Sequence, residues 1–194
     1  MPALRRFAYY ARLSAEDKAT YCRSDEITAV QIPDPPALVV HSKAIEVALF
    51  SGVRARVAKA VTAFIAEFCQ QLFAPPVKVH VREVRPDLES AELHGLYTFR
   101  TEDSPPKLEV WMRTRAHEKV VKHRTFMRTI VHELCHHLDM EVIGLRESFH
   151  TQGFFRRESS IVRQVLETKK PASEKKPPEA PKKKAGSAQR SLFE

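Results

Sequence analysis

Apolar residues recur every three or four positions along much of the N-terminal half of this 194-residue chain. This period is typical of amphipathic helices that bury one face. It predicts helical structure of mixed polarity in residues 5–31 and a long helix over residues 43–73. Ser42 is expected to cap the long helix, and Gly52 to kink it or divide it in two. The apolar stripe of the long helix comprises Ile45, Leu49, Val53, Val57, Val61, Phe64, Ile65 and Phe68.

The middle of the chain alternates between apolar and polar residues, which is the pattern of half-buried β-strands. It predicts strands at residues 77–84, 93–100 and 107–113. The last two are separated by a turn-rich segment, residues 101–106. We expect the strand at 107–113 to lie at a sheet edge, where an extended peptide could pair with it.

Helical periodicity returns after the third strand. Thr125 is a candidate N-cap, Gly144 a candidate stop, and residues 153–167 form a predicted closing helix. This order of helices, strands and helices favours an α+β fold. The apolar stripe of the helix that starts near Thr125 comprises Phe126, Met127, Ile130, Val131, Leu134 and Leu138.

Within that helix, residues 132–136 have the sequence HExxH. Residues four apart lie on one helix face, so His132 and His136 can direct their imidazoles at one metal ion. Zinc at a catalytic site takes three protein ligands and a water. Glu133 lies about 100° around the helix from His132, where it can take a proton from the activated water. The motif therefore predicts one zinc ion per chain and Glu133 as catalytic base, against the alternative of two incidental core histidines.

A third protein ligand is needed, and the chain offers several. His150 follows His136 after a short loop in which the chain can turn back towards the metal. Glu147 and Glu158 are the carboxylate alternatives, and the position of Glu158 is close to that of the ligand in glutamate-ligated peptidases. His150 is the preferred ligand, with Glu158 next.

Three further residues near the motif have expected roles. Asp139 shares the face of His132 and His136, where it can orient an imidazole from outside the ligand set. His137 points away from His132 and is not expected to bind the metal. Cys135 is expected to be a small buried apolar residue.

The HELCH run at 132–136, followed by HTQGFF at 150–155, resembles the SprT-like (Spartan-type) zinc metallopeptidases. The resemblance covers roughly residues 43–167. Family members often have glycine directly after the third histidine, whereas Gly153 stands three residues after His150. The resemblance implies a minimal zincin-like fold with a long N-terminal helix, a small, mostly antiparallel sheet, the HExxH helix and a closing helix. It also implies proteolysis of proteins held on DNA.

Composition indicates where such a protein works. No apolar run approaches the 18 residues that a membrane span requires, so we expect no membrane partner. Residues 1–7 are not followed by an apolar signal core, which argues against secretion. Three scattered cysteines suit a reducing compartment. The expected location is the cytoplasm.

The net charge of +8 is concentrated at one end. Residues 168–194 hold seven lysines and one arginine against three glutamates. The Lys/Pro-rich part, residues 168–188, is predicted to be a disordered linker because it has little apolar surface to bury. Its lysines can make weak, salt-dependent contacts with DNA phosphates.

We divide the chain into an extension (1–41), a peptidase domain (42–167), the linker (168–188) and a terminal motif (189–194).

The terminal motif, residues 189–194, resembles the QxSLF peptide with which bacterial replication and repair proteins bind the DNA sliding clamp. The resemblance implies that Gln189 hydrogen-bonds at one subsite and that Leu192 and Phe193 enter an apolar pocket. Ser191 is the serine of the QxSLF pattern. The alternative is an apolar end that folds back on the body of the protein.

These expectations combine into three functional hypotheses. The first is a zinc peptidase that the sliding clamp brings to DNA, where it degrades associated or crosslinked proteins. In the second, the peptidase cleaves a soluble regulator or peptide and has no link to DNA. In the third, the chain is a non-catalytic, zinc-stabilised clamp adaptor. Glu133 argues against the third, because a structural metal site does not need a proton shuttle.

Overall fold

A computed structural model describes residues 6–86 and 93–166 of the chain, and it confirms the α+β class. The linker at 168–188 and the clamp-binding motif at 189–194 lie outside the described residues. In chain order the elements are a 3₁₀ helix, η1 (Ala8–Arg12), then α1 (Ala15–Glu26), α2 (Pro35–Ser51), α3 (Arg54–Gln71), β1 (Lys78–Val84), β2 (Gly95–Thr98), β3 (Lys107–Arg113), α4 (His123–Glu141) and α5 (Gln152–Leu166).

Two helices, α2 and α3, occupy the region where one long helix was expected. Gly52 ends α2 with a left-handed φ of 65°, and its N–H donates to the Leu49 carbonyl at 3.0 Å. Glycine adopts this conformation without strain, so the prediction that Gly52 divides the helix is confirmed. The prediction that Ser42 caps the helix is wrong, because α2 begins at Pro35 with Asp34 as its N-cap. The domain boundary drawn at residue 42 consequently falls inside α2.

The sheet has the strand order β1-β3-β2 and is mixed. β1 runs parallel to β3 and β2 antiparallel to it, so the sheet is not mostly antiparallel as expected. The prediction that residues 107–113 form an edge strand is also wrong, because β3 is the central strand. Its five inner residues are all buried, as is typical of a strand with neighbours on both sides.

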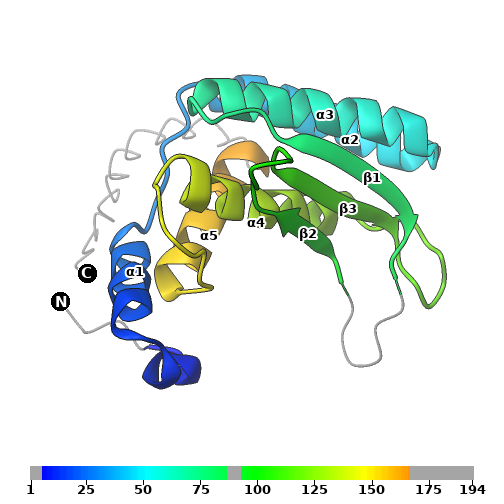
Figure 1. Ribbon diagram of the computed structural model, residues 1–194. Coiled ribbons are helices and arrows are strands. Elements are labelled where there is room, and N and C mark those ends of the chain that lie inside the picture. Colours follow the sequence, from blue (N-terminus) through cyan, green and yellow to red (C-terminus); the bar gives the residue numbers. More distant parts are fainter. Residues whose placement is uncertain (1–5, 87–92, 167–194) are drawn as a thin grey trace, which may run out of the picture.

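The helices are arranged around this sheet so that α3 packs along β1 and α4 lies beside β2 (Figure 1). Eleven of the 19 residues of α4 are buried, which makes it the central helix of the core. It begins at His123 without a side-chain cap, so the assignment of Thr125 as cap is wrong. It ends at Glu141, and Gly144 follows in a turn with a φ of 68°. The loop from 142 to 151 then leads back to α5.

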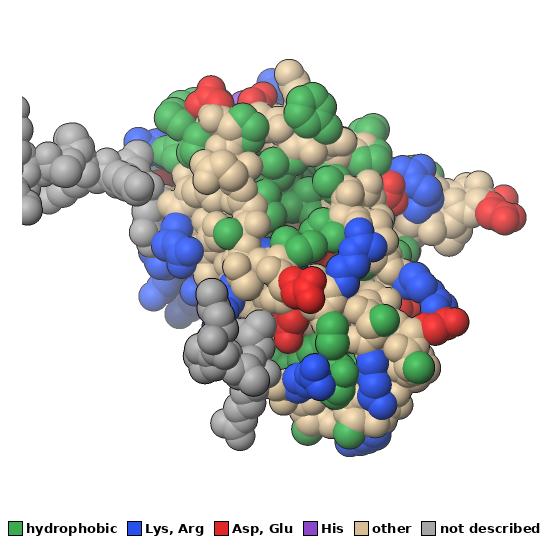
Figure 2. Space-filling model, turned by 90° about the vertical axis from the view of Figure 1, so that its left-hand side faces the viewer, with side chains coloured by type: hydrophobic (Ala, Val, Ile, Leu, Met, Phe, Trp, Pro, Cys, Tyr) green, Lys and Arg blue, Asp and Glu red, His purple; other side chains and the backbone are tan. Residues whose placement is uncertain are grey.

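Helix α5 contacts α4 on one side, and the N-terminal segment packs on its other side, where α1 contacts α5 (Figure 1). On the face of the molecule that includes this side, basic and acidic side chains are interspersed with apolar ones (Figure 2). None of the helices in the described residues is long and apolar enough to cross a membrane.

Candidate metal centre

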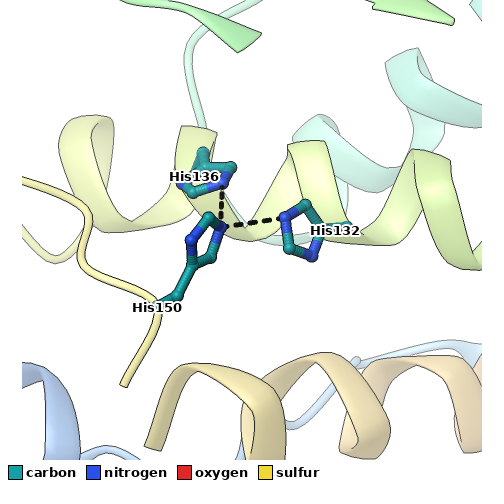
Figure 3. A group of neighbouring side chains, drawn as sticks. All are labelled: His132, His136 and His150. Atoms are coloured by element: carbon teal, nitrogen blue, oxygen red, sulfur yellow. Dashed lines mark hydrogen bonds between the residues drawn. The ribbon is translucent and has the colours of Figure 1, made fainter. Parts of the chain in front are cut away.

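Three histidine side chains converge on one point between α4 and the loop that follows it (Figure 3). The Nε2 atom of His150 lies 3.0 Å from Nε2 of His132 and 3.1 Å from Nε2 of His136. Two nitrogens bound to one tetrahedral zinc at about 2.0–2.1 Å would lie about 3.3–3.4 Å apart. The three histidines therefore lie close enough together to bind a metal ion.

The placement of the first two histidines follows from helix geometry, and that of the third from the loop. His132 and His136 are one turn apart on the same face of α4. His150 lies near the end of the loop that joins α4 to α5, and its side chain faces the other two histidines (Figure 3). The structure thus brings together the three histidines that the sequence singled out.

The outer ring nitrogens of the two helical histidines have hydrogen-bond partners that select a tautomer. Nδ1 of His132 lies 3.1 Å from Oε2 of Glu158, and a carboxylate can only accept. Nδ1 of His136 lies 2.7 Å from the Ser148 hydroxyl, which donates its own hydrogen to Asp139 at 2.8 Å. In both rings Nδ1 must then carry the proton, which leaves the Nε2 lone pair facing the centre.

The carboxylates considered as third ligands do not join this cluster. Glu158 contacts the far side of the His132 ring, where it also pairs with Arg128 at 3.6 Å. Glu147 is exposed in the loop. Among the described residues, His132, His136 and His150 are the group whose ligand atoms approach one another within 4.8 Å.

Burial influences the protonation state of two of the three histidines. It lowers the pKa of His136 to about 3, with further lowering from the neighbouring His132 and His150 rings. Burial also lowers the pKa of His150. A neutral imidazole is the form that binds metal, so the lowered pKa values of His136 and His150 favour the metal-binding form of both rings.

Glu133 is buried, with 6% of its surface exposed, beside strand β2. Burial raises the pKa of its carboxyl to about 7, although His132 and a hydrogen bond from the backbone of Tyr97 favour the charged form. Gly95 makes this packing possible, because a Cβ there would lie 2.8 Å from both Cγ of Glu133 and Cγ2 of Thr129. A carboxyl with a pKa near 7 suits general acid–base chemistry at neutral pH.

His137, Cys135 and Asp139 are not part of the group formed by His132, His136 and His150. His137 is fully buried, and its ring nitrogens lie 2.9 Å from the Tyr97 hydroxyl and 2.8 Å from the Pro75 carbonyl oxygen. Cys135 is buried in the core. Asp139 reaches His136 through the hydroxyl of Ser148, not directly.

A cleft of about 530 Å³ opens over the three histidines. Strand β2 and helix α4 form much of its wall, and Leu96 and Phe99 present apolar side chains that are 41% and 39% exposed. Among the described residues, β2 pairs with β3 alone, so its other edge is not occupied by a strand. The cleft therefore combines a potential metal site, an acid–base group and a strand edge.

Four residues of the site were not singled out from the sequence: Gly95, Tyr97, Ser148 and Arg157. Gly95 and Tyr97 belong to a short strand, and nothing in the local sequence indicates that this strand packs against α4. Ser148 and Arg157 are ordinary residues of a loop and a helix until folding places them around Asp139.

Comparison with protein-family models, with curated proteins and with solved structures found no match to this chain. The case for the centre consequently depends on its own geometry and on the sequence motif.

Proposed function

We propose that the chain is a zinc-dependent metallopeptidase of the SprT-like type, with His132, His136 and His150 as metal ligands and Glu133 as catalytic base. The observation that carries this proposal is the convergence of three Nε2 atoms in the cleft that Glu133 also lines. Two of these atoms, those of His132 and His136, direct a lone pair at the centre. This arrangement favours a cation there.

A zinc ion held by these ligands would lower the pKa of a water molecule and polarise the carbonyl of the scissile peptide. Glu133 lines the same cleft and would be the group that accepts a proton on its carboxylate and returns it to the leaving amine. The backbone N–H of Tyr97 holds the carboxylate in position. Glu158 and Ser148 fix the tautomers of the two helical histidines from outside the ligand set.

The substrate is a polypeptide in extended form. The edge of β2 that no strand of the described residues occupies offers backbone groups to which a peptide strand can add, and this replaces β3 as the expected docking edge. The exposed side chains of Leu96 and Phe99 supply apolar contacts beside it. A peptide that docks in this way must be extended, so unfolded or loosely held segments are the expected substrates.

We further propose that the substrates are proteins associated with or crosslinked to DNA, and that the sliding clamp recruits the enzyme in the cytoplasm. The resemblance of residues 132–136 and 150–155 to SprT-like peptidases supports the first part. The QxSLF-like motif at 189–194 and the basic linker support the second.

The test compares wild type with Glu133→Gln on a protein–DNA crosslink and on an unfolded protein without DNA. We expect Glu133→Gln to keep its zinc and lose cleavage by roughly 10²–10⁴-fold, the usual contribution of a general base. Cleavage that survives in this variant would remove Glu133 from the mechanism. Cleavage of the free protein but not of the crosslink would retain the peptidase and remove its link to DNA.

A further inference from the structure

Arg157 is a buried arginine for which the proposed peptidase chemistry has no direct use. Only 1% of its surface is exposed, and it comes from α5, which lies between α4 and α1. On one side, its Nη2 donates to both carboxylate oxygens of Asp139 at 2.7 and 3.0 Å. A buried charge pair of this kind needs further hydrogen bonds to offset its desolvation.

Those further hydrogen bonds come from the end of α1. Nη1 of Arg157 donates to the carbonyl oxygens of Ser24 and Ile27, both at 2.6 Å. Nη2 also reaches the Ser24 hydroxyl at 3.1 Å. Arg157 thus joins the N-terminal segment to Asp139, which the Ser148 hydroxyl connects to His136.

A second set of contacts ties the same segment to His150. The carboxylate of Asp25 accepts from the backbone N–H of Gly153 at 2.8 Å, at the start of α5. The approach is so close that a Cβ at Gly153 would lie 2.6 Å from Cα of Asp25. The hydroxyl of Tyr9 donates to the carbonyl oxygen of His150 at 3.1 Å.

An aromatic contact completes this attachment. The ring of Phe155 stacks on His150 at 5.8 Å between centroids, and Phe7 packs edge-on against Phe155 at 6.2 Å. The N-terminal segment, residues 6–27, therefore touches the supports of two of the three histidines.

We infer that the N-terminal segment holds two of the histidines in place for the metal. Arg157 is the positioning residue that links the segment to His136, whereas Asp25, Tyr9 and Phe7 link it to His150. The inference rests on the proposed metal site. Docking of residues 6–27 and metal binding then stabilise each other, because a coupling between two binding events is reciprocal. The segment that the sequence suggested was an extension is, on this account, part of the centre.

The experiment measures Co²⁺ affinity of the full-length, metal-free protein by chelator competition, together with the visible spectrum of the Co²⁺ complex. In Arg157→Met we expect about 10–100-fold weaker binding, the usual effect of losing an outer support of a ligand, and an altered spectrum. The matched control is Arg113→Met. Arg113 also bonds to backbone carbonyls, those of Gly52 and Glu118, but lies away from the histidines, so its loss should leave Co²⁺ affinity unchanged.

A second measurement follows amide hydrogen exchange in α1 with and without Co²⁺. We expect slower exchange in the metal-bound protein. Equal affinity of folded Arg157→Met and wild type, or equal exchange of α1 in both states, would overturn the inference. If Arg157→Met does not fold, Asp25→Ala decides: a several-fold loss of affinity supports the inference and unchanged affinity overturns it.

The Co²⁺ affinity of the wild type distinguishes a failure of this inference from a failure of the proposed function. Wild type that binds no Co²⁺ would remove the metal site itself and the inference with it. Wild type that binds Co²⁺ as tightly as every variant would leave the metal site intact and overturn only the role of Arg157.

Discussion

Each imidazole of the centre has one nitrogen turned inward and, for the two on α4, one turned outward to a hydrogen-bond acceptor. The acceptors are Glu158 for His132 and Ser148 for His136. Because the outward contacts decide which nitrogen carries the proton, they also decide whether the inward nitrogen can bind a metal. Single hydrogen bonds on the outer side of each ring thus favour the tautomer in which the inner nitrogen can bind a metal.

The first prediction separates ligand from support. His150→Ala should lose most of its zinc on dialysis, because a ligand is removed. Glu158→Ala should keep zinc with an affinity lower by about 10–100-fold, because only the outer partner of His132 is lost. Elemental analysis and chelator competition measure both effects. If Glu158→Ala lost the metal and His150→Ala kept it, Glu158 would be the ligand instead.

The second prediction concerns the contact between Gly95 and Glu133. Gly95→Ala places a methyl group against the Glu133 carboxylate and the Thr129 side chain, so the base must move. We expect peptidase activity to fall by at least about 10-fold, since misplacement of a catalytic group by 1 Å can cost 10²-fold. Zinc content should not change.

Gly144→Ala is the matched control for this variant. Nothing lies within 4 Å of the Cβ position at Gly144, but its φ of 68° makes alanine unfavourable. This variant should therefore lose roughly 1 kcal/mol of stability in denaturant unfolding and keep its activity. If Gly95→Ala were fully active, the packing of β2 against Glu133 would not matter for catalysis.

At the scale of elements, the short strand β2 joins the sheet to the candidate site. It spans only Gly95–Thr98, yet it pairs with β3 on one edge and lines the cleft along with α4. Its backbone also holds Glu133 through Tyr97. An edge strand beside a catalytic group can align a peptide by main-chain hydrogen bonds.

The third prediction tests this alignment with peptides that are N-methylated at alternate residues. Methylation of the amides that face β2 should weaken inhibition or cleavage by about 10-fold, since each lost hydrogen bond is worth about 1 kcal/mol and the methyl group also clashes. Methylation of the intervening amides serves as the control and should have little effect. Equal loss from both series would show that the peptide does not pair with β2.

At the scale of the whole molecule, sequence-distant segments meet around the centre. The N-terminal segment closes one side through Arg157, and the sheet with α4 forms the other. The proposed clamp-binding motif is connected to α5 by a linker of some twenty residues. Such a linker would span roughly 25 Å as a flexible coil, so the motif can bind the clamp while the cleft stays accessible.

The fourth prediction is that removal of residues 189–194 abolishes binding to a bacterial sliding clamp and leaves cleavage of a free unfolded protein unchanged. The reason is that the proposed clamp-binding motif and the candidate metal centre lie in different parts of the chain. Surface plasmon resonance on immobilised clamp and a peptide-cleavage assay measure the two. The control replaces Leu192 and Phe193 by alanine, which keeps the length and should abolish binding equally. Unaltered clamp binding in both variants would exclude the motif.

Local rules were enough to predict several structural features of this protein from its sequence. The HExxH spacing determines that His132 and His136 share a helix face, because helix geometry depends only on hydrogen bonds within the segment. The division at Gly52 and the α+β order of elements are local for the same reason. His150 was a plausible partner because its loop is short.

Long-range contacts decided the rest. The central position of β3, the parallel pairing with β1 and the outward position of Glu158 each depend on which segments pack together, and no period in the sequence encodes that. The same holds for Arg157, which has no signal in its own helix because its partners in α1 lie more than 130 residues away. The sequence alone therefore indicated the three histidines and the glutamate of the candidate site. Only the tertiary structure decided that His150 and not Glu158 joins the helical histidines, and which residues hold the group in place, because those contacts join segments that are distant in the chain.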